Sequence, residues 1–270
     1  MQALKVRPSD IWVVSFPKCG TTLTQELVWQ VAHGLDLEGG KVELMQRFPF
    51  LEGDTLRDNA DNVTLPSLET APAQDQRFIK THLPLSLLPP DLLTTAKVVY
   101  VARNPKDTMV SSYHHYKLFK SISFTGDLKS FSKRFMKGQV MHGPYFPHLE
   151  EGWRLRNHPN MLFLFYEDII RDMKSCVEKV CMFLGKELTE CKMDQLLEHL
   201  DIKKFRHNPA VNMETLRPSG RFNDEEGSFI RKGEVGGWRE EFGDHVGLET
   251  VFDDWIGENM REFSIQFPNY

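Results

Sequence analysis

The chain has 270 residues, of which 40% are hydrophobic and 26% are charged, as in an ordinary soluble globular protein. A formal charge of −5 argues against broad electrostatic capture of nucleic acid or of an anionic membrane, so any anion site must be local. The four cysteines form no CxxC pair, and the sequence shows neither a signal peptide nor an apolar run of about 18 residues. We therefore expect a single cytoplasmic domain over residues 1–270 with free thiols and no nucleic-acid or membrane partner.

The first predicted elements are a strand, a tight loop and a helix. Residues 11–16 (IWVVSF) are apolar and rich in β-branched side chains, which is typical of a buried strand that stops before Pro17. Apolar residues at near-helical spacing predict a helix over residues 21–33, and Gly34 is a plausible end for it. The loop between them, KCGTT, joins the end of a strand to the start of a helix.

Further apolar runs predict strands over residues 77–80, 97–102 and 161–166. The last run, MLFLFY, is continuous in its hydrophobicity, as parallel strands covered on both faces tend to be. Residues 52–76 are polar, with scattered Gly, Pro, Asn and Asp, and predict mostly loop.

Helical patterns occur between and after these strands, over residues 106–116, over residues 172–200 as two helices broken near Gly185, and over residues 246–263. Residues 217–237 are rich in glycine and charge and predict a functional loop. Strands that alternate with helices predict an α/β domain whose central, mostly parallel sheet is flanked by helices. In such domains ligands bind at the carboxyl ends of the strands.

The loop KCGTT has the features of an anion site. A glycine and two threonines at a helix start offer free backbone N–H groups, hydroxyl donors and the positive end of the helix dipole. The loop departs from the GxxxxGK[ST] phosphate loop because Lys18 precedes the last glycine instead of following it. A bare Gly-Thr-Thr is more often an ordinary helix cap than an anion site. Lys18 beside it favours an anion site but does not by itself decide between the two.

Other segments place charge at strand ends. In RFIKTHLP, Lys80 and His82 stand two residues apart, so both side chains leave the same face of a strand. In ARNPKD, Arg103 ends another strand, and Ser111 follows about two turns into the next helix. A late segment, FIRKGEVGGW, supplies Arg231, Lys232 and Gly233.

Together these segments resemble the cytosolic sulfotransferase family, which transfers a sulfuryl group from 3′-phosphoadenosine 5′-phosphosulfate (PAPS) to an acceptor hydroxyl or amine. FPKCGTTL is similar to the family pattern YPKSGTTW, and RKGEVGGW is similar to RKGxxGDW, with Gly237 in place of the Asp. The family's KTHLP, RNxKD and FYED segments are also matched. In order and spacing the resemblance covers nearly the whole chain.

The resemblance implies a site for PAPS and for its product, 3′-phosphoadenosine 5′-phosphate (PAP). The 5′ side would be held by the loop residues Lys18, Cys19, Gly20, Thr21 and Thr22. The 3′-phosphate would be held by Arg103, Ser111, Arg231, Lys232 and Gly233, since Arg makes paired charge-assisted hydrogen bonds. Tyr166 matches a family residue near the nucleotide, and the aliphatic residues Leu23, Leu200 and Ile202 fall in segments where the family has adenine-stacking aromatics.

The resemblance also implies the catalytic roles. His82 would be the general base on the acceptor hydroxyl, Lys18 would stabilise the leaving oxygen, and Lys80 would hold the sulfuryl oxygens. No metal is expected, because the transferred sulfuryl carries less negative charge than a γ-phosphoryl and no carboxylate cluster adjoins these motifs.

The acceptor is expected to be a small phenol or hydrophobic alcohol, bound in an apolar, aromatic pocket. The resemblance brings Phe50, His82 and His115 to this pocket, although runs such as YHHY more often pack along a helix face. Looser candidates are Tyr145, Phe146 and Phe222. The oligomeric state is open between monomer and homodimer.

Three alternatives remain. A P-loop nucleotide kinase is weakened by the order of the loop and by the lack of evident Mg²⁺ carboxylates. A non-catalytic nucleotide or ligand carrier is suggested by Leu23 and Ile202, but Lys18, Lys80 and His82 speak against it. A related dehydratase would sulfate an alcohol and then eliminate sulfate.

Overall fold

The strands form one parallel sheet in the order β2-β1-β3-β4. Their bounds are Ile11–Val14 for β1, Phe78–Thr81 for β2, Lys97–Ala102 for β3 and Met161–Phe165 for β4. The structure is a computed structural model that describes residues 2–56, 64–261, 263 and 265–268. The strands predicted from the sequence are confirmed to within one or two residues at their ends.

The sheet is buried on both faces because successive side chains of its strands enter two different hydrophobic clusters. In β1, Trp12 and Val14 belong to one cluster, whereas Ile11 and Val13 belong to the other. This alternation explains why the strand sequences are apolar throughout instead of alternating with polar residues.

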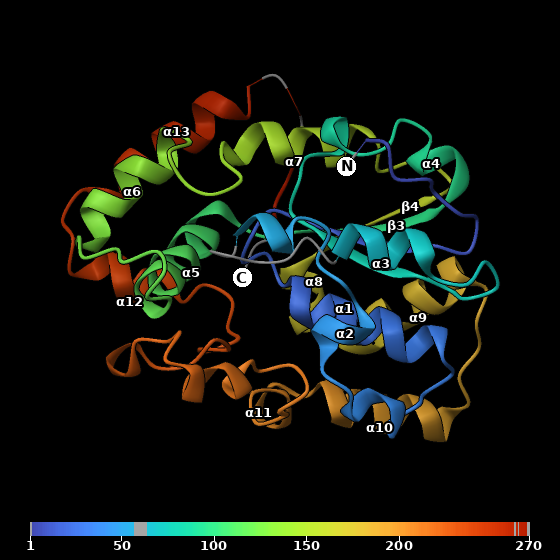
Figure 1. Cartoon of the computed structure of the whole chain (residues 1–270). Coiled ribbons are helices and arrows are strands. Elements are labelled where there is room, and N and C mark those ends of the chain that lie inside the picture. The colour runs from blue at the N-terminus through green and yellow to red at the C-terminus, as the bar shows by residue number, and fades with distance from the viewer. Residues whose placement is uncertain (1, 57–63, 262, 264, 269–270) are drawn as a thin grey trace.

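Helices cover each face of the sheet (Figure 1). The cluster with Trp12 takes its side chains from α6 (Leu128–Met136), α7 (Tyr145–Arg154) and α13 (Leu248–Asn259). The cluster with Ile11 takes them from α1 (Thr21–Ala32), α9 (Met173–Leu184) and α10 (Glu190–Leu200). The chain is therefore the α/β domain that the sequence predicts.

The strand order creates a crevice at the carboxyl end of β1. The chain runs from β1 to β2 on one side and then crosses to β3 on the other side. In doubly wound sheets ligands bind where the strand order reverses in this way. Lys18, His82 and Arg103 each follow one of these three strands, so the topology alone brings them to one edge of the sheet.

The remaining helices are short, apart from α5, and lie mostly in connections. They are α2 (Leu44–Arg47), α3 (Thr64–Thr70), α4 (Leu92–Thr95), α5 (Pro105–Leu118), α8 (Tyr166–Arg171), α11 (Ile202–Phe205) and α12 (Trp238–Gly243). The 3₁₀ turns are η1 (Gly39–Lys41), η2 (Gly53–Leu56), η3 (Leu85–Leu87), η4 (Glu214–Ser219) and η5 (Asp224–Glu226). The Asn104 side chain caps α5 by accepting from the Lys106 N–H, while Pro105 occupies the first helical position, where no N–H is needed.

The predicted break between α9 and α10 is confirmed, since α9 ends at Gly185 in the left-handed conformation. The expectation of mostly loop over residues 52–76 is wrong for η2 and α3, and residues 57–63 lie outside the described chain. Helix α3 forms because the Asp54 carboxylate accepts the Thr64 N–H at its start and Leu68 is buried. The loop predicted over residues 217–237 likewise contains η5 and part of η4, and the helix predicted over residues 246–263 is shorter.

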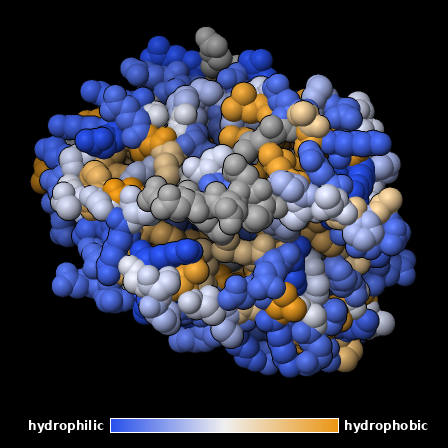
Figure 2. Space-filling model, in the orientation of Figure 1, coloured by the Kyte–Doolittle hydropathy of each residue, from blue (hydrophilic) through white to orange (hydrophobic). Residues whose placement is uncertain are grey.

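The surface is mainly hydrophilic on the face shown in Figure 2, where hydrophobic residues appear in small patches. None of the helices among the described residues is long and apolar enough to span a membrane.

Candidate active site

A cavity of about 670 Å³ opens at the carboxyl ends of β1, β2 and β3. Most residues predicted for the cofactor and acceptor sites line it, namely Lys18, Gly20, Thr21, Thr22, Leu23, Phe50, Lys80, His82, Arg103, Ser111, His115, Tyr166, Ile202, Arg231, Lys232 and Gly233. Segments that are far apart in the sequence thus meet in one place. Cys19, Tyr145 and Leu200 are the predicted site residues that do not line it.

The loop after β1 has a backbone that only certain residues adopt easily. Lys18 lies in the left-handed region with φ of 68°, and Gly20 has φ of 97°. A Cβ atom at position 20 would lie 2.3 Å from Cδ2 of Tyr166, so glycine is required by both conformation and space. Left-handed non-glycine residues such as Lys18 are uncommon and concentrate at functional sites.

The start of α1 is free to bind an anion. The first N–H groups of a helix have no partner within it, and here no side chain of the described residues caps them. The first turn contains no acidic residue. The Thr21 hydroxyl is bonded to the Ser15 hydroxyl at 2.6 Å, while Thr22 faces the cavity.

Two partly buried lysines bring positive charge to the cavity. Burial lowers the pKa of Lys18 to about 7, assisted by the nearby charges of Arg103, Lys80 and Arg231. Burial also lowers the pKa of Lys80 to about 8, against the opposing effect of Glu52. The Lys18 ammonium lies 4.3 Å from the ring centre of Phe229, and that of Lys80 lies 4.2 Å from Phe50. A bound anion would favour the charged form of both lysines.

Arg103 connects three segments around the cavity. Its guanidinium donates to the main-chain oxygens of Lys18 at 3.2 Å and Glu234 at 2.9 Å, and lies 4.4 Å from the ring centre of Tyr166. Its buried Nε has no hydrogen-bond partner in the described structure. Because buried donors are nearly always paired, this N–H fits a site whose acceptor comes from a bound anion.

Asp107 fixes the late glycine-rich loop against α5. Its carboxylate accepts the Gly236 N–H at 2.7 Å and the Trp238 N–H at 3.1 Å. These bonds place the loop segment with Arg231 beside the segment with Arg103. Asp107 belongs to the RNPKD motif, which was the available sequence signal for this role.

The cations of the late loop are paired with carboxylates in this structure. Arg231 donates to Glu241 at 3.1 Å, and Lys232 donates to Glu240. Gly233 has φ of 70°, and a Cβ there would lie 2.3 Å from Cδ1 of Ile202. Ile202 therefore packs directly on the loop and faces the cavity, as expected of a residue beside the nucleotide.

His82 is held in one tautomer. Its Nδ1 lies 2.8 Å from the main-chain oxygen of Ser15, which can only accept, so Nδ1 carries the proton and Nε2 keeps a free lone pair. Burial lowers the pKa of His82 well below its ordinary value, and Lys80 and His142 lower it further. The ring is therefore neutral near pH 7 and can accept a proton at Nε2.

The main chain of His82 is fixed from two further sides. Its N–H donates to Oε1 of Glu52 at 2.5 Å, and Nε2 of His148 donates to its carbonyl oxygen at 3.0 Å. Glu52 also accepts from the Thr81 hydroxyl at 2.8 Å, and the Tyr100 hydroxyl lies 2.7 Å from Nδ1 of His148. Sequence reasoning missed Glu52 and His148 as supports of His82. Only the fold brings them to it.

One side of the cavity is aromatic. The Phe50 ring lies 5.3 Å from that of His82, and the His115 ring lies 4.6 Å from that of Phe119. The buried Nδ1 of His115 has no partner among the described residues, and burial lowers the pKa of His115 well below its ordinary value. Both predicted residues, Phe50 and His115, thus line the cavity.

Several predicted residues lie elsewhere. Tyr145 is in the core, where its hydroxyl donates to the Arg103 carbonyl and its ring packs on Phe16. The looser candidates Phe146 and Phe222 are also buried outside the cavity lining. The reason is that aromatic residues of α7 and of the segment after η4 complete the hydrophobic core.

Cys19 and Leu200 also point away from the cavity. The Cys19 thiol is buried 3.6 Å from the Thr108 hydroxyl, and burial raises its pKa to about 12. Leu200 joins the hydrophobic cluster of α1 and α10. Of the residues expected to replace the adenine-stacking aromatics, only Leu23 and Ile202 face the cavity.

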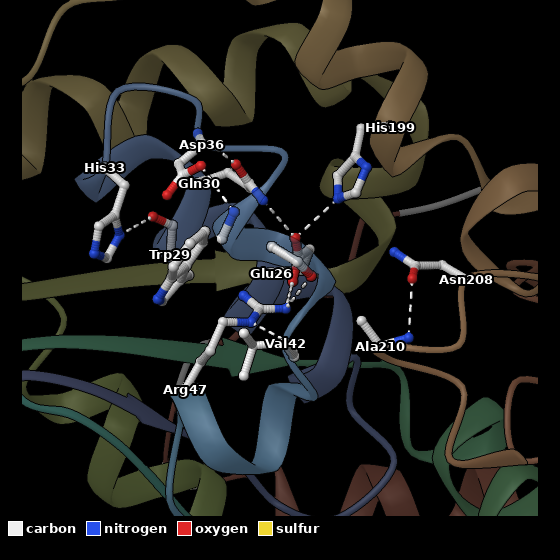
Figure 3. A network of polar contacts seen from close by, with 12 residues as sticks. Glu26, Trp29, Gln30, His33, Asp36, Val42, Arg47, His199, Asn208 and Ala210 are labelled. Atoms are coloured by element: carbon white, nitrogen blue, oxygen red, sulfur yellow. Dashed lines mark hydrogen bonds and ion pairs between the residues drawn. The ribbon is translucent and has the colours of Figure 1, made fainter. Parts of the chain in front are cut away.

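A buried polar network behind the loop fixes α1 (Figure 3). The Glu26 carboxylate accepts from Gln30 and His199 at 2.8 Å each and from Arg47 at 2.7 Å. Burial would raise the pKa of Glu26, but these hydrogen bonds hold it below its ordinary value. The network joins α1 to α10 and to the segment that leads to Phe50.

The described residues contain no group of three or more His, Cys, Asp or Glu side chains that could hold a metal ion.

Comparison with known proteins gives a consistent result. The family model described as "Sulfotransferase domain" matches residues 8–264. The chain is 36% identical to luciferin sulfotransferase of Photinus pyralis, over 96% of this chain and 74% of that protein, and 35% identical to sulfotransferase 1C2 of Rattus norvegicus, over 99% and 88%. Among solved structures, retinol dehydratase in complex with androsterone and the inactive cofactor PAP superposes with a TM-score of 0.89. It is 37% identical in sequence, over 99% of this chain and 85% of that chain.

Proposed function

Because this chain belongs to the sulfotransferase family, we propose that it transfers a sulfuryl group from PAPS to the hydroxyl or amine of a small hydrophobic acceptor, with His82 as the general base. One observation carries the proposal. Lys18 and Lys80, which are partly buried, and the buried Arg103 bring positive charge to the same cavity in which His82 presents a free Nε2 lone pair.

The residues that line the cavity fit PAPS. Free amides at the start of α1 and the Lys18 ammonium would hold its 5′ side, and Arg103 with its unpaired Nε would hold the 3′-phosphate. Arg231 and Lys232 would join the 3′ site by exchanging Glu241 and Glu240 for phosphate oxygens. Bound PAPS supplies a sulfuryl group whose leaving group is a phosphate.

Each catalytic side chain has one task. Nε2 of His82 accepts the proton of the acceptor hydroxyl as that oxygen attacks sulfur. Lys18 stabilises the negative charge that develops on the leaving oxygen, and Lys80 stabilises the sulfuryl oxygens. Lys18 and Lys80 supply positive charge without a metal ion, and we propose that none takes part.

The acceptor class follows from the lining of the cavity. Phe48, Phe50 and Phe229 give it aromatic walls, and the Phe50 ring lies 5.3 Å from that of His82. Two of the relatives named above are a luciferin sulfotransferase and a retinol dehydratase bound to androsterone, and luciferin, retinol and androsterone are small hydrophobic compounds. We infer that this chain acts on phenols or hydrophobic alcohols of that size.

We further propose a cytoplasmic protein that works as a monomer or homodimer without nucleic acid or membrane. The net charge of −5 and the free thiols Cys19, Cys176, Cys181 and Cys191 support this proposal.

Transfer from sulfur-labelled PAPS to a panel of phenols, alcohols and amines tests the function. We expect labelled sulfate esters and stoichiometric PAP. Phosphoryl transfer from ATP with Mg²⁺, and none from PAPS, would favour a nucleotide kinase instead. PAP binding without any transfer would favour a carrier. Loss of the acceptor hydroxyl with release of free sulfate would identify a dehydratase, which mass spectrometry of the product would detect.

A further inference from the structure

His142 is a second histidine beside the base, and none of the motifs predicts it. It lies in the turn before α7, where the Gly143 N–H bonds to the Val140 carbonyl, and it adopts a left-handed φ of 61°. It lines the cavity, and its ring centre lies 5.5 Å from that of His82.

The side chain of His142 is buried but has no hydrogen-bond partner among the described residues. Only 9% of it is exposed, and the nearest carboxylate oxygen, Oε1 of Glu52, lies 4.0 Å from Nδ1, too far for a hydrogen bond. Burial and the charge of Lys80 lower the pKa of His142 to about 4. The ring is therefore neutral near pH 7, with one N–H donor and one acceptor nitrogen.

We propose that His142 selects acceptors that carry a second oxygen next to the reacting hydroxyl, as in a catechol, a 1,2-diol or an α-hydroxy ketone. This inference rests on the proposed function, because it assumes that the reacting hydroxyl lies at Nε2 of His82.

The geometry permits such a pair of contacts. An oxygen hydrogen-bonded to an imidazole nitrogen lies about 4 Å from the ring centre. Oxygens on adjacent carbons are separated by roughly the length of one hydrogen bond. Two rings with centres 5.5 Å apart can therefore each bind one oxygen of such a pair. The walls formed by Phe50 and Met141 offer the rest of the acceptor only apolar contacts.

The test compares 4-methylcatechol with 4-methylphenol in the wild type, His142→Phe and His142→Gln. In the wild type we expect kcat/KM to favour the catechol about tenfold or more, beyond the factor of about two that its second hydroxyl gives statistically. His142→Phe keeps a ring but loses the hydrogen bond. It should reduce the ratio to about two while turnover of 4-methylphenol persists. His142→Gln retains a donor and an acceptor and should preserve part of the preference. His207→Phe, at an exposed position outside the cavity lining, is the matched control and should leave the ratio unchanged.

The proposal is overturned if the wild type shows no preference, or if His142→Phe lowers turnover of both acceptors equally. The second result would place His142 on the reacting oxygen. Calorimetric affinities of the two acceptors for the PAP-bound protein provide a readout that needs no turnover. An affinity preference that His142→Phe removes, without any sulfation, would support the contact between His142 and the second oxygen while refuting the proposed function. Sulfation without a His142-dependent preference would support the proposed function and refute the inference on His142.

Discussion

Nδ1 of His82 donates a hydrogen bond to the main-chain oxygen of Ser15 over 2.8 Å, and this contact determines which nitrogen can act on an acceptor. Ser15 directly follows β1 and His82 directly follows β2, so the pairing of two parallel strands positions the base. The lone pair that remains on Nε2 is a consequence of the sheet register.

Removal of His82 should separate chemistry from nucleotide binding. A general base contributes about 10²–10⁴-fold, so His82→Ala should lower kcat by at least about 100-fold. PAP affinity should stay within about twofold, because the ligands proposed for PAP come from other residues. Steady-state kinetics and calorimetry measure the two quantities. Wild-type turnover in the variant would remove His82 from the mechanism.

Binding of PAP should take up protons above neutral pH. The pKa of Lys18 is lowered to about 7 in the free protein, and a bound anion raises it. Below pH 7 the free ammonium is already charged, so affinity varies little with pH through this group. Above pH 7 the free lysine must gain a proton on binding, so affinity falls by up to about tenfold per pH unit.

Calorimetry in buffers of different ionisation enthalpy counts those protons. Lys80, with its pKa lowered to about 8, contributes uptake as well. The Lys18→Arg variant stays charged at all these pH values, so its difference from the wild type isolates Lys18. Equal proton uptake by the two proteins would contradict the assignment.

Loss of the Asp107 carboxylate should weaken the cofactor site by releasing the glycine-rich loop that it holds. Asp107→Ala leaves the N–H groups of Gly236 and Trp238 without their acceptor, which costs about 1–3 kcal/mol per unsatisfied buried group. We expect the Kd for PAP to rise more than the KM for the acceptor, since the loop carries Arg231. Asp254→Ala, at an exposed position, is the control and should change neither value. If Asp107→Ala lowers stability but leaves the affinity for PAP unchanged, Asp107 supports the fold and not the cofactor site.

The Glu26 network should matter for stability (Figure 3). Glu26→Gln leaves the buried Arg47 without a carboxylate, and breaking a buried pair costs about 3–5 kcal/mol. Urea denaturation should show this loss. Glu198→Gln removes an exposed partner of Lys204 and should cause no measurable change. Equal urea midpoints for Glu26→Gln and Glu198→Gln would contradict the stabilising role of the Glu26 network.

The sequence predicted the parts of the fold that have a strong local signal. The strands are continuous apolar runs bounded by Pro, Gly or charge, and the break between α9 and α10 coincides with a left-handed glycine. Helix α3 was missed because its sequence, TLPSLET, is polar and contains a proline, and its start depends on the distant carboxylate of Asp54. Helices α6 and α7 fall in a stretch for which no element was predicted.

The cavity residues were predictable where a motif follows a strand, as for Lys18, His82 and Arg103. Tyr145 was misplaced because a sequence cannot tell an aromatic residue of the core from one of a pocket. Glu52, His148 and His142 carry no motif of their own. Glu52 and His142 lie in turns and His148 lies in α7, and only tertiary packing brings the three side chains to His82.

The most direct test of the account is calorimetry of wild-type protein and Arg103→Ala with PAP and with adenosine 5′-monophosphate, which lacks the 3′-phosphate. The account predicts one PAP per chain in the wild type. It also predicts that Arg103→Ala weakens PAP by about 10- to 100-fold, the range expected for hydrogen bonds to a charged group, and weakens the monophosphate far less. Absence of heat with PAP, or equal losses for both nucleotides, would contradict the central claim that the cluster around Arg103 and Lys18 binds a nucleotide with two separate anionic groups.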